Sequence, residues 1–329
     1  MSTINERLIS YVESSFLAPL LKEEAITDVS YNGKDLFYEN RKLGRKKSKI
    51  HPSLGDVSDF LRQIANFSEK QFSFRSPILD VSFGRYRLNA VFHSIARVKD
   101  EKVFTFAMRI GKEGTAIKEK DPAFWGDSQS LLLSALEGGE SILIAGETGA
   151  GKTELQKYLI SHLKPNTRVI VIDNVGELEL SRGDDDLDMT SWLVDERNEN
   201  ASFDVLIRNA LRNNPDYLLV AESRGKEMLD ALNCVMAGHP IITTLHAKDI
   251  YAVPSRIARM AMQSGQRLSF DDLLADIYHH FSVVVYLKKI VSPKGVIRYI
   301  DQVGRLNEAK RKVDLIYQRK GGTHEEKED

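Results

Sequence analysis

The stretch Gly146-Glu147-Thr148-Gly149-Ala150-Gly151-Lys152-Thr153 decides the fold of this chain. It matches the pattern G-x-x-x-x-G-K-[ST]; the apolar run 142–145 precedes it, and the helix-favouring residues 153–163 follow it. Between a strand and a helix, this pattern predicts a phosphate-binding loop. The glycines let backbone N–H groups turn inward around an anion, and the helix N-terminus adds partial positive charge. Lys152 would neutralise the β- and γ-phosphates of a nucleotide, and the Thr153 hydroxyl would bind Mg²⁺.

Short apolar runs around and after this loop alternate with helical segments, which indicates a largely parallel sheet with right-handed crossovers. The expected buried strands are residues 141–145, 168–172, 217–221 and 241–245, and the expected helices are 153–163, 203–212 and 226–236. Strands at 283–288, 296–306 and 313–318 follow without helices between them. We expect an α/β domain over residues 123–320.

The first third of the chain reads as a smaller α+β domain over residues 1–110. Its expected helices are 4–21 and 54–67, and its expected strands are a hairpin over 27–40 that turns at Asn32-Gly33, a pair over 78–92 and a strand at 103–110. The polar segment 111–122 is the expected linker. The charged tail 321–329 is expected to be disordered.

Composition restricts the function classes. No apolar run is long enough to cross a bilayer, and residues 1–10 do not resemble a signal peptide. The single cysteine, Cys234, excludes an intrachain disulfide and a four-cysteine zinc site, so we expect a cytoplasmic protein. Residues 1–120 carry 21 of the 46 Lys and Arg but only 15 of the 47 Asp and Glu. This basic front third either faces an anionic partner or reflects chance variation.

Three polar residues stand at or just after the ends of predicted strands, on the same sheet edge as the loop. Glu177 follows the strand that ends at Asp173, Glu222 follows the strand 217–221, and His246 follows the strand 241–245. Ligands of parallel α/β sheets bind at this carboxyl edge. The three residues therefore predict the chemical groups of the same nucleotide site.

With these elements the chain resembles the secretion-ATPase superfamily, which powers type II secretion, type IV pili, archaeal-type filaments and type IV secretion or conjugation. Four boxes carry the resemblance in order: a Walker A box at 146–153, an acidic box ending in Glu177, a Walker B box at 211–224 and a histidine box at 238–247. In the front domain, residues 77–80, 84–90 and 108–110 are similar to family hairpin and strand motifs. The likeness covers residues 27–287 and implies a RecA-like P-loop NTPase domain.

The chain departs from the family pattern at two places. Asp173-Asn174 stands where the family often has Glu-Asp, and Ala221 stands where a glycine usually precedes the Walker B glutamate. The four-cysteine zinc module of many type II members is absent. That absence and the short front domain favour the type IV secretion/conjugation or Tad-pilus branch.

The resemblance implies a role for each site residue. Glu177 would orient or deprotonate the attacking water, Glu222 would hold Mg²⁺ through water, and His246 would sense the γ-phosphate. Arg87 and Arg109 would act as arginine fingers, a task that Arg208 and Arg212 could share unless they pair with Glu222. The complete expected set of residues is catalytic Glu177, Glu222, Arg87, Arg109, His246 and Arg224; nucleotide-binding Gly146, Glu147, Thr148, Gly149, Ala150, Gly151, Lys152, Thr153 and Glu154; and metal-binding Thr153 and Glu222.

Residues 41–49 contain six basic side chains in nine positions. Such a run could bind anionic lipid at a membrane surface, or it could be a solvated hairpin loop. Nucleic acid is a weaker alternative, because no aromatic residues are interleaved to stack on bases.

The resemblance implies a homohexameric motor that uses ATP and Mg²⁺ and works against inner-membrane components of a type IV secretion or conjugation machine, at the inner face of the cytoplasmic membrane. Alternatives are a Tad or type IV pilus motor for assembly or retraction, a nucleotide-gated scaffold with little turnover, and a DNA translocase or helicase. Steady-state turnover separates motor from scaffold, and stimulation by single-stranded DNA indicates a translocase.

Overall fold

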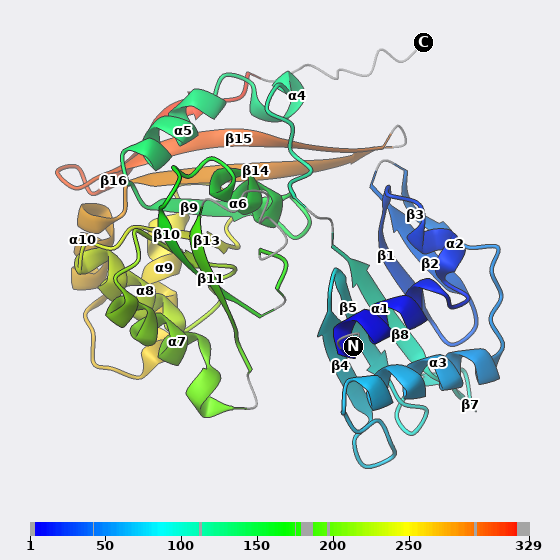
Figure 1. Cartoon of the computed structure of the whole chain (residues 1–329). Helices are drawn as coiled ribbons and strands as arrows, with labels where there is room; N and C mark the ends of the chain where they lie inside the picture. Colours follow the sequence, from blue (N-terminus) through cyan, green and yellow to red (C-terminus); the bar gives the residue numbers. More distant parts are fainter. Residues whose placement is uncertain are drawn as a thin grey trace, which may run out of the picture. The chain divides into compact units, whose positions relative to one another are not determined.

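The computed structural model describes residues 4–41, 43–111, 114–174, 176–178, 187–195, 198–292 and 295–320. The chain divides into two compact units (Figure 1). Unit 1 is Met1–Glu113 with Ile290–Ile297, and unit 2 is Gly114–Lys289 with Arg298–Asp329. The tail 321–329 and residues 112–113 of the expected linker lie outside the described residues.

Unit 1 contains a six-stranded antiparallel sheet covered by helices and a separate two-stranded antiparallel pair, β6–β7. The strand order of the six-stranded sheet is β3-β2-β1-β8-β5-β4, and each neighbouring pair is antiparallel. Leu8 of α1 and Phe60 of α3 belong to the same buried cluster as Leu88 and Met108 of the sheet, so these helices share one face. The elements are α1 (Ile4–Glu13), α2 (Ala18–Leu21), β1 (Ile26–Tyr31), β2 (Leu36–Asn40), β3 (Gly44–Lys47), α3 (Leu54–Phe67), β4 (Ile78–Phe83), β5 (Tyr86–Val91), β6 (Arg97–Val98), β7 (Glu101–Lys102) and β8 (Thr105–Ile110).

Local sequence explains how these elements begin and turn. The Asn32 side chain accepts hydrogen bonds from the backbone N–H groups of Lys34 and Asp35, which closes the predicted β1–β2 turn. Ser53 and Asp56 form a reciprocal capping box at the start of α3. The single helix expected over 4–21 is instead two helices, because α1 ends at Glu13 and α2 begins only at Ala18.

The basic run 41–49 includes an edge strand, which corrects the hairpin-loop reading. β3 pairs with β2 in the register Glu39↔Arg45 and Phe37↔Lys47. The Arg45 guanidinium lies over the Phe37 ring, 5.4 Å from its centroid, and donates to the Ser30 hydroxyl. The sequence did not predict this strand, because its consecutive basic residues lack the alternation of apolar and polar residues that marks a half-buried strand. Lysine on an edge strand discourages pairing with other chains.

Unit 2 is built on an eight-stranded sheet in the order β11-β10-β12-β13-β9-β14-β15-β16. The strands from β11 to β14 are parallel, and β15 pairs with β16 antiparallel. The elements are α4 (Pro122–Trp125), α5 (Gln129–Glu137), β9 (Ile142–Gly146), α6 (Lys152–Ile160), β10 (Arg168–Asp173), β11 (Asp188–Leu193), η2 (Glu199–Ala201), α7 (Phe203–Ala210), η3 (Leu211–Asn213), β12 (Tyr217–Val220), α8 (Glu227–Met236), β13 (Ile241–Leu245), α9 (Val253–Ala261), η4 (Met262–Ser264), α10 (Phe270–His280), β14 (Val283–Ser292), β15 (Gly295–Asn307) and β16 (Lys312–Gln318).

Alternate residues of the central strands enter two different cores. On β9, Leu143 and Ala145 pack with α7, α8, α9 and α10, whereas Ile142 and Ile144 pack with α5 and α6. Figure 1 shows these two groups of helices on opposite sides of the strands. Because both faces are covered, the central strands are largely apolar, as the sequence predicts, with the buried Thr243 and Thr244 of β13 as exceptions.

The sequence reading missed β11 and helices α5, α9 and α10. β11 (DMTSWL) is an edge strand whose side chains are mostly half-buried or exposed, so it lacks the apolar run of a central strand. It is nevertheless paired with β10 in parallel register from Arg168↔Asp188 to Asp173↔Leu193.

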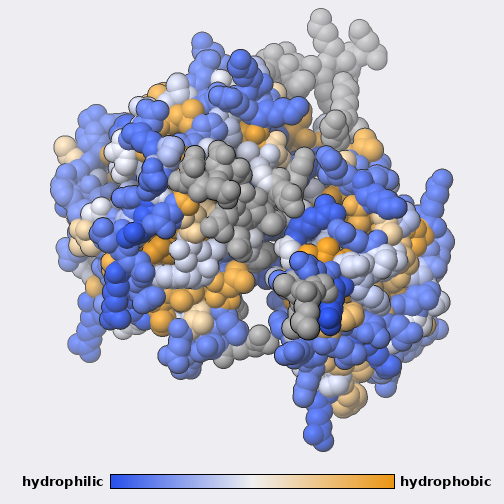
Figure 2. Space-filling view, viewed as in Figure 1, coloured by the Kyte–Doolittle hydropathy of each residue, from blue (hydrophilic) through white to orange (hydrophobic). Residues whose placement is uncertain are grey.

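The surface carries separate exposed apolar side chains. On the face seen in Figure 2 hydrophilic residues predominate, with smaller hydrophobic patches between them. Phe74 is 73% exposed and Leu43 is 65% exposed, both in unit 1. Among the described helices, none has the length and apolar character needed to cross a membrane.

Leu143 in β9 supports the strand that delivers the phosphate loop, and it is 0% exposed. We expect Leu143→Ala to lower the free energy of unfolding by about 2–5 kcal/mol, because it leaves a cavity between the sheet and its helices. Leu315→Ala, at a position that is 44% exposed, is the control and should change stability by less than about 0.5 kcal/mol. Denaturant titration of both variants measures this; equal effects would contradict the buried position of Leu143.

Candidate active site

The phosphate loop connects β9 to α6 at the carboxyl edge of the sheet. A Cβ on Gly146 would lie 2.7 Å from the backbone oxygen of Leu287 on β14, so only glycine fits there. Glu147, Thr148 and Gly149 are exposed at the top of the loop, whereas Ala150 is buried and its N–H bonds to the Glu147 carbonyl. This turn presents the loop at the sheet edge, as the sequence predicts.

Lys152 is the first residue of α6, and its side chain turns back over the loop. Its Nζ donates to the carbonyl oxygens of Gly146 and Glu147, each at 3.0 Å. Burial lowers the pKa of the Lys152 ammonium below its usual value, although the nearby Glu222 carboxylate opposes that shift. The cation is thus held at the mouth of the loop, where a phosphate would bind.

Glu222, Arg224 and His246 form one contact group beside the loop. Arg224 Nη2 donates to Glu222 Oε2 at 2.7 Å, and His246 Nε2 lies 3.0 Å from Glu222 Oε1. On its other side, His246 Nδ1 lies 3.1 Å from the carbonyl oxygen of Gly146. A carbonyl can only accept, so Nδ1 carries the proton. His246 therefore connects the Walker B acid to the first residue of the phosphate loop.

The Glu222 carboxylate is ionised and incompletely partnered. Burial raises its pKa, but the hydrogen bond from Arg224 and the charges of Arg224, His246 and Lys152 bring the net pKa below its usual value. The His246 contact lacks hydrogen-bond alignment, and the buried Oε1 has no hydrogen-bond donor among the described residues. A buried charged oxygen without a donor fits a site for hydrated Mg²⁺.

Any Mg²⁺ here needs ligands from nucleotide and water as well as from protein. Within the described part of the chain, no three His, Cys, Asp or Glu side chains cluster closely enough to hold a metal by themselves. Thr153 is half-buried in the first turn of α6, next to Lys152. Mg²⁺ commonly keeps several waters and binds few protein groups beside substrate phosphates, which agrees with this donor set.

Asp173 fixes the turn that carries Glu177. Asp173 ends β10 and is 1% exposed, and its Oδ2 accepts a hydrogen bond from the N–H of Leu178 at 3.2 Å. Glu177 is half-buried in this turn, at the same sheet edge as the loop. The aspartate that departs from the family pattern thus has a structural task, which sequence reasoning missed.

Gln156 is a further residue that sequence reasoning missed. It lies on α6, is 0% exposed, and its Nε2 donates to the carbonyl of Val220 at 3.0 Å and to that of Ile242 at 3.5 Å. These carbonyls belong to β12 and β13, the strands that lead to Glu222 and His246. Gln156 therefore ties the phosphate-loop helix to both strands. A polar residue at a buried helix position was the only available sequence signal.

Glu154 follows the loop and binds the segment that enters unit 2. Its carboxylate accepts from the N–H of Ala116, and its carbonyl accepts from the Thr115 hydroxyl at 3.0 Å. The ammonium of Lys157, whose side chain is 1% exposed, lies 3.5 Å from Glu154 Oε1. The side chain expected to bind nucleotide is thus engaged with the start of unit 2.

Arg87 and Arg109 are direct register partners on β5 and β8 of unit 1. Arg87 Nη2 lies 3.7 Å from Asp80 Oδ2, and Arg109 Nε lies 3.6 Å from Asp28 Oδ1. Both arginines are at least one-third exposed, so these pairs are weak. The sequence placed these residues on separate strands, and the sheet brings them together.

Arg208 does not pair with Glu222, which corrects that alternative. It pairs with Asp204 on its own helix and with Asp230 on α8. Arg212 lies beyond the end of α7, in η3. The arginine that pairs with Glu222 is Arg224, two residues along the chain.

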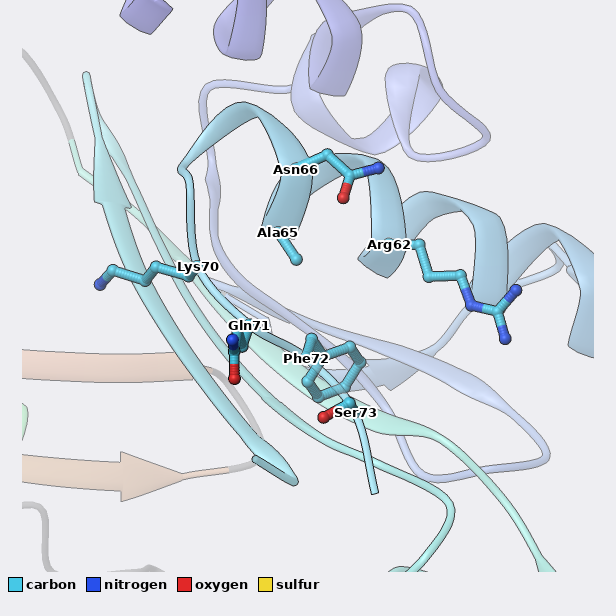
Figure 3. Close-up of a pocket in the computed structure, with 7 residues that line it drawn as sticks. All are labelled: Arg62, Ala65, Asn66, Lys70, Gln71, Phe72 and Ser73. Atoms are coloured by element: carbon cyan, nitrogen blue, oxygen red, sulfur yellow. The ribbon is translucent and has the colours of Figure 1, made fainter. Parts of the chain in front are cut away.

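A shallow pocket of about 400 Å³ lies in unit 1 (Figure 3). Arg62, Ala65 and Asn66 of α3 line it, and the segment after that helix forms the rest (Figure 3). Lys70, one of its two cations, donates to the backbone oxygen of Asp80. The pocket contains none of the expected site residues.

Comparison with known proteins identifies the family of this chain. The family described as type II/IV secretion system protein matches residues 116–311, which include the phosphate loop, Glu177, Glu222 and His246. The chain belongs to this family. Relatives by sequence include the type IV secretion system proteins VirB11 and PtlH. The RecA-like fold expected from sequence is confirmed.

Individual relatives extend the likeness. An uncharacterised protein of Bacillus anthracis is 30% identical over 318 residues, which is 90% of this chain and 70% of that protein. The type IV secretion system protein VirB11 of Brucella suis is 32% identical over 200 residues, but the match spans only 55% of VirB11 and 59% of this chain. The Legionella pneumophila ATPase DotB has the same fold, with a TM-score of 0.65, 20% identity and coverage of 93% of this chain and 81% of DotB.

Gln156→Leu removes the donor to two buried carbonyls while keeping side-chain volume. We expect the free energy of unfolding to fall by about 1–3 kcal/mol, the cost of leaving buried polar groups unpaired. Gln266→Leu, at an exposed position of unit 2, is the matched control. Chemical denaturation of both variants measures the difference, and an unchanged midpoint for Gln156→Leu would show that these hydrogen bonds contribute nothing.

Proposed function

We propose that this chain is an ATP-hydrolysing motor subunit of a type IV secretion or conjugation machine and works as a homohexamer with Mg²⁺. The observation that carries the proposal is the contact chain from the phosphate loop through His246 to Glu222. A loop that only binds phosphate does not require an acid and a histidine connected to its first residue. A site that cleaves the γ-phosphate from a nucleotide and responds to its presence requires both the acid and the histidine.

Each residue of the site has a distinct task in this proposal. Lys152 neutralises the β- and γ-phosphates, and Glu177 orients or deprotonates the attacking water, held in place by the Asp173–Leu178 hydrogen bond. His246 senses the γ-phosphate, because any displacement of Gly146 changes its Nδ1 contact. Bound Mg²⁺ would supply charge neutralisation at the phosphates, held by the Thr153 hydroxyl and, through water, by Glu222.

Arg87 and Arg109 serve as arginine fingers in this proposal. Their weak pairs with Asp80 and Asp28 are easily exchanged for a phosphate, since exposed ion pairs contribute little. Fingers on unit 1 would make hydrolysis depend on unit 1 meeting the nucleotide. In a closed ring, that dependence converts turnover into movement of neighbouring subunits.

The partners proposed for the motor are inner-membrane components of the secretion apparatus, at the inner face of the cytoplasmic membrane. The likeness to VirB11, a type IV secretion system protein, supports this assignment. A pilus motor is the rival within the same family. The neighbouring reading frames decide between the two: genes of a conjugative coupling protein support the proposal, whereas pilin genes support the rival.

Glu177→Gln should keep ATP binding and slow steady-state hydrolysis by about 10²–10⁴, the usual contribution of a positioned acid–base group. Phosphate release and equilibrium nucleotide binding, measured on the same preparation, separate the two effects. Glu222→Gln is the comparison variant. Normal turnover by Glu177→Gln together with loss in Glu222→Gln would assign the base to Glu222 instead.

Arg109→Ala should reduce turnover by about 10³–10⁵ with nearly unchanged nucleotide affinity, the range known for arginine fingers. Wild-type activity per subunit should also rise with protein concentration as rings assemble. The control is Arg62→Ala, another exposed arginine of unit 1. A monomer with concentration-independent activity and no response to Arg109→Ala would leave only a generic P-loop ATPase.

A further inference from the structure

Two cations from the C-terminal strands lie against the phosphate loop. Lys289 is on β14 and Arg298 is on β15, neighbouring strands of the unit 2 sheet. Both follow the loop by more than a hundred residues, and neither belongs to the four sequence boxes. Their position at Gly149 suggests a task in the nucleotide site.

Arg298 holds the loop by its backbone. Its Nε donates to the carbonyl oxygen of Gly149 at 2.7 Å. Its Cδ lies 3.8 Å from the position that a Cβ on Gly151 would occupy, so the side chain extends along the loop. Arg298 thereby fixes the direction of the Gly149 peptide group. It is a positioning residue, because it contacts the loop and not the reacting atoms.

Lys289 is placed to contact a ligand. Its Nζ lies 3.3 Å from the position that a Cβ on Gly149 would occupy, and Gly149 has φ +75°. The residue is half-buried, yet among the described residues its ammonium has no carboxylate within ion-pair distance. A half-buried ammonium without a counter-charge is costly to maintain unless an anion binds beside it.

We propose that Lys289 binds a phosphate oxygen of the nucleotide held in the loop, while Arg298 positions the loop for this contact. The proposal rests on the nucleotide site proposed above and extends it by a second fixed cation. Lys152 approaches the phosphates from the helix side, and Lys289 approaches from the strand β14. Since phosphate loops cradle the α- and β-phosphates with their backbone, Lys289 serves ATP and ADP alike.

The test compares three variants by calorimetric titration with ATP and with ADP, each with Mg²⁺. Lys289→Gln should weaken both affinities by about tenfold or more, the effect of losing one hydrogen bond to a charged group. Lys289→Arg should restore most of the affinity because the charge remains. Lys288→Gln is the matched control: the neighbouring lysine on β14 is exposed and lies on the opposite face of the strand, so its loss should change little.

Salt dependence provides a readout that a structural defect would not change. Each lysine that contacts a phosphate contributes to the fall of affinity with rising salt, so Lys289→Gln should bind with a shallower slope than wild type. Thermal denaturation without nucleotide verifies that each variant is folded. Arg298→Gln should weaken both affinities as well, whereas an unchanged affinity for Arg298→Gln would overturn its positioning task.

The outcomes separate this inference from the proposed function. If the wild-type chain binds ATP and Lys152→Ala does not, the nucleotide site stands. Equal affinity of Lys289→Gln and wild type would then overturn the Lys289 contact alone, as would a loss no greater than that of Lys288→Gln. If the wild-type chain fails to bind ATP or ADP, the nucleotide site itself is rejected.

Discussion

The carbonyl oxygen of Gly146 is the point on which the candidate active site depends. Lys152 Nζ and His246 Nδ1 both contact it, at 3.0 and 3.1 Å, and the approach of β14 leaves no room for a side chain at this residue. This single backbone oxygen therefore contacts both the Lys152 ammonium on α6 and the His246 ring that follows β13. Because the strands are parallel, their ends meet here, and the two apolar cores on either side of the sheet keep these ends in register.

The sequence predicted those features of the fold and the site whose pattern lies within one short stretch of residues. The phosphate loop, the central strands and the polar groups at their ends follow short patterns, and the structure has them at one sheet edge. Contacts between distant segments could not be read in the same way. Arg298 reaches Gly149, and Arg87 faces Arg109, through strand pairing that no single stretch of sequence encodes. β3 was missed for a different reason, because its basic residues mask the alternation of an edge strand.

Two buried polar residues, Asp173 and Gln156, act by holding the backbone next to the candidate site. Asp173 is shorter than the glutamate often found at this position in the family, and this length suits a buried carboxylate that bonds to the backbone of the following turn. Gln156 performs a similar task from the other side, with one amide that reaches the carbonyls of two strands. Both residues hold backbone and not substrate. Their importance is visible only when their hydrogen-bond partners are known.

The attachment of Thr115 and Ala116 to Glu154 has a mechanical consequence. The chain enters unit 2 at Gly114 and is fastened almost at once to the first turn of the phosphate-loop helix. A pull on the chain at Gly114 would therefore be transmitted to α6 through the contacts of Thr115 and Ala116. A load applied there would act directly on the phosphate-loop helix, so force and the proposed nucleotide site would share one attachment point.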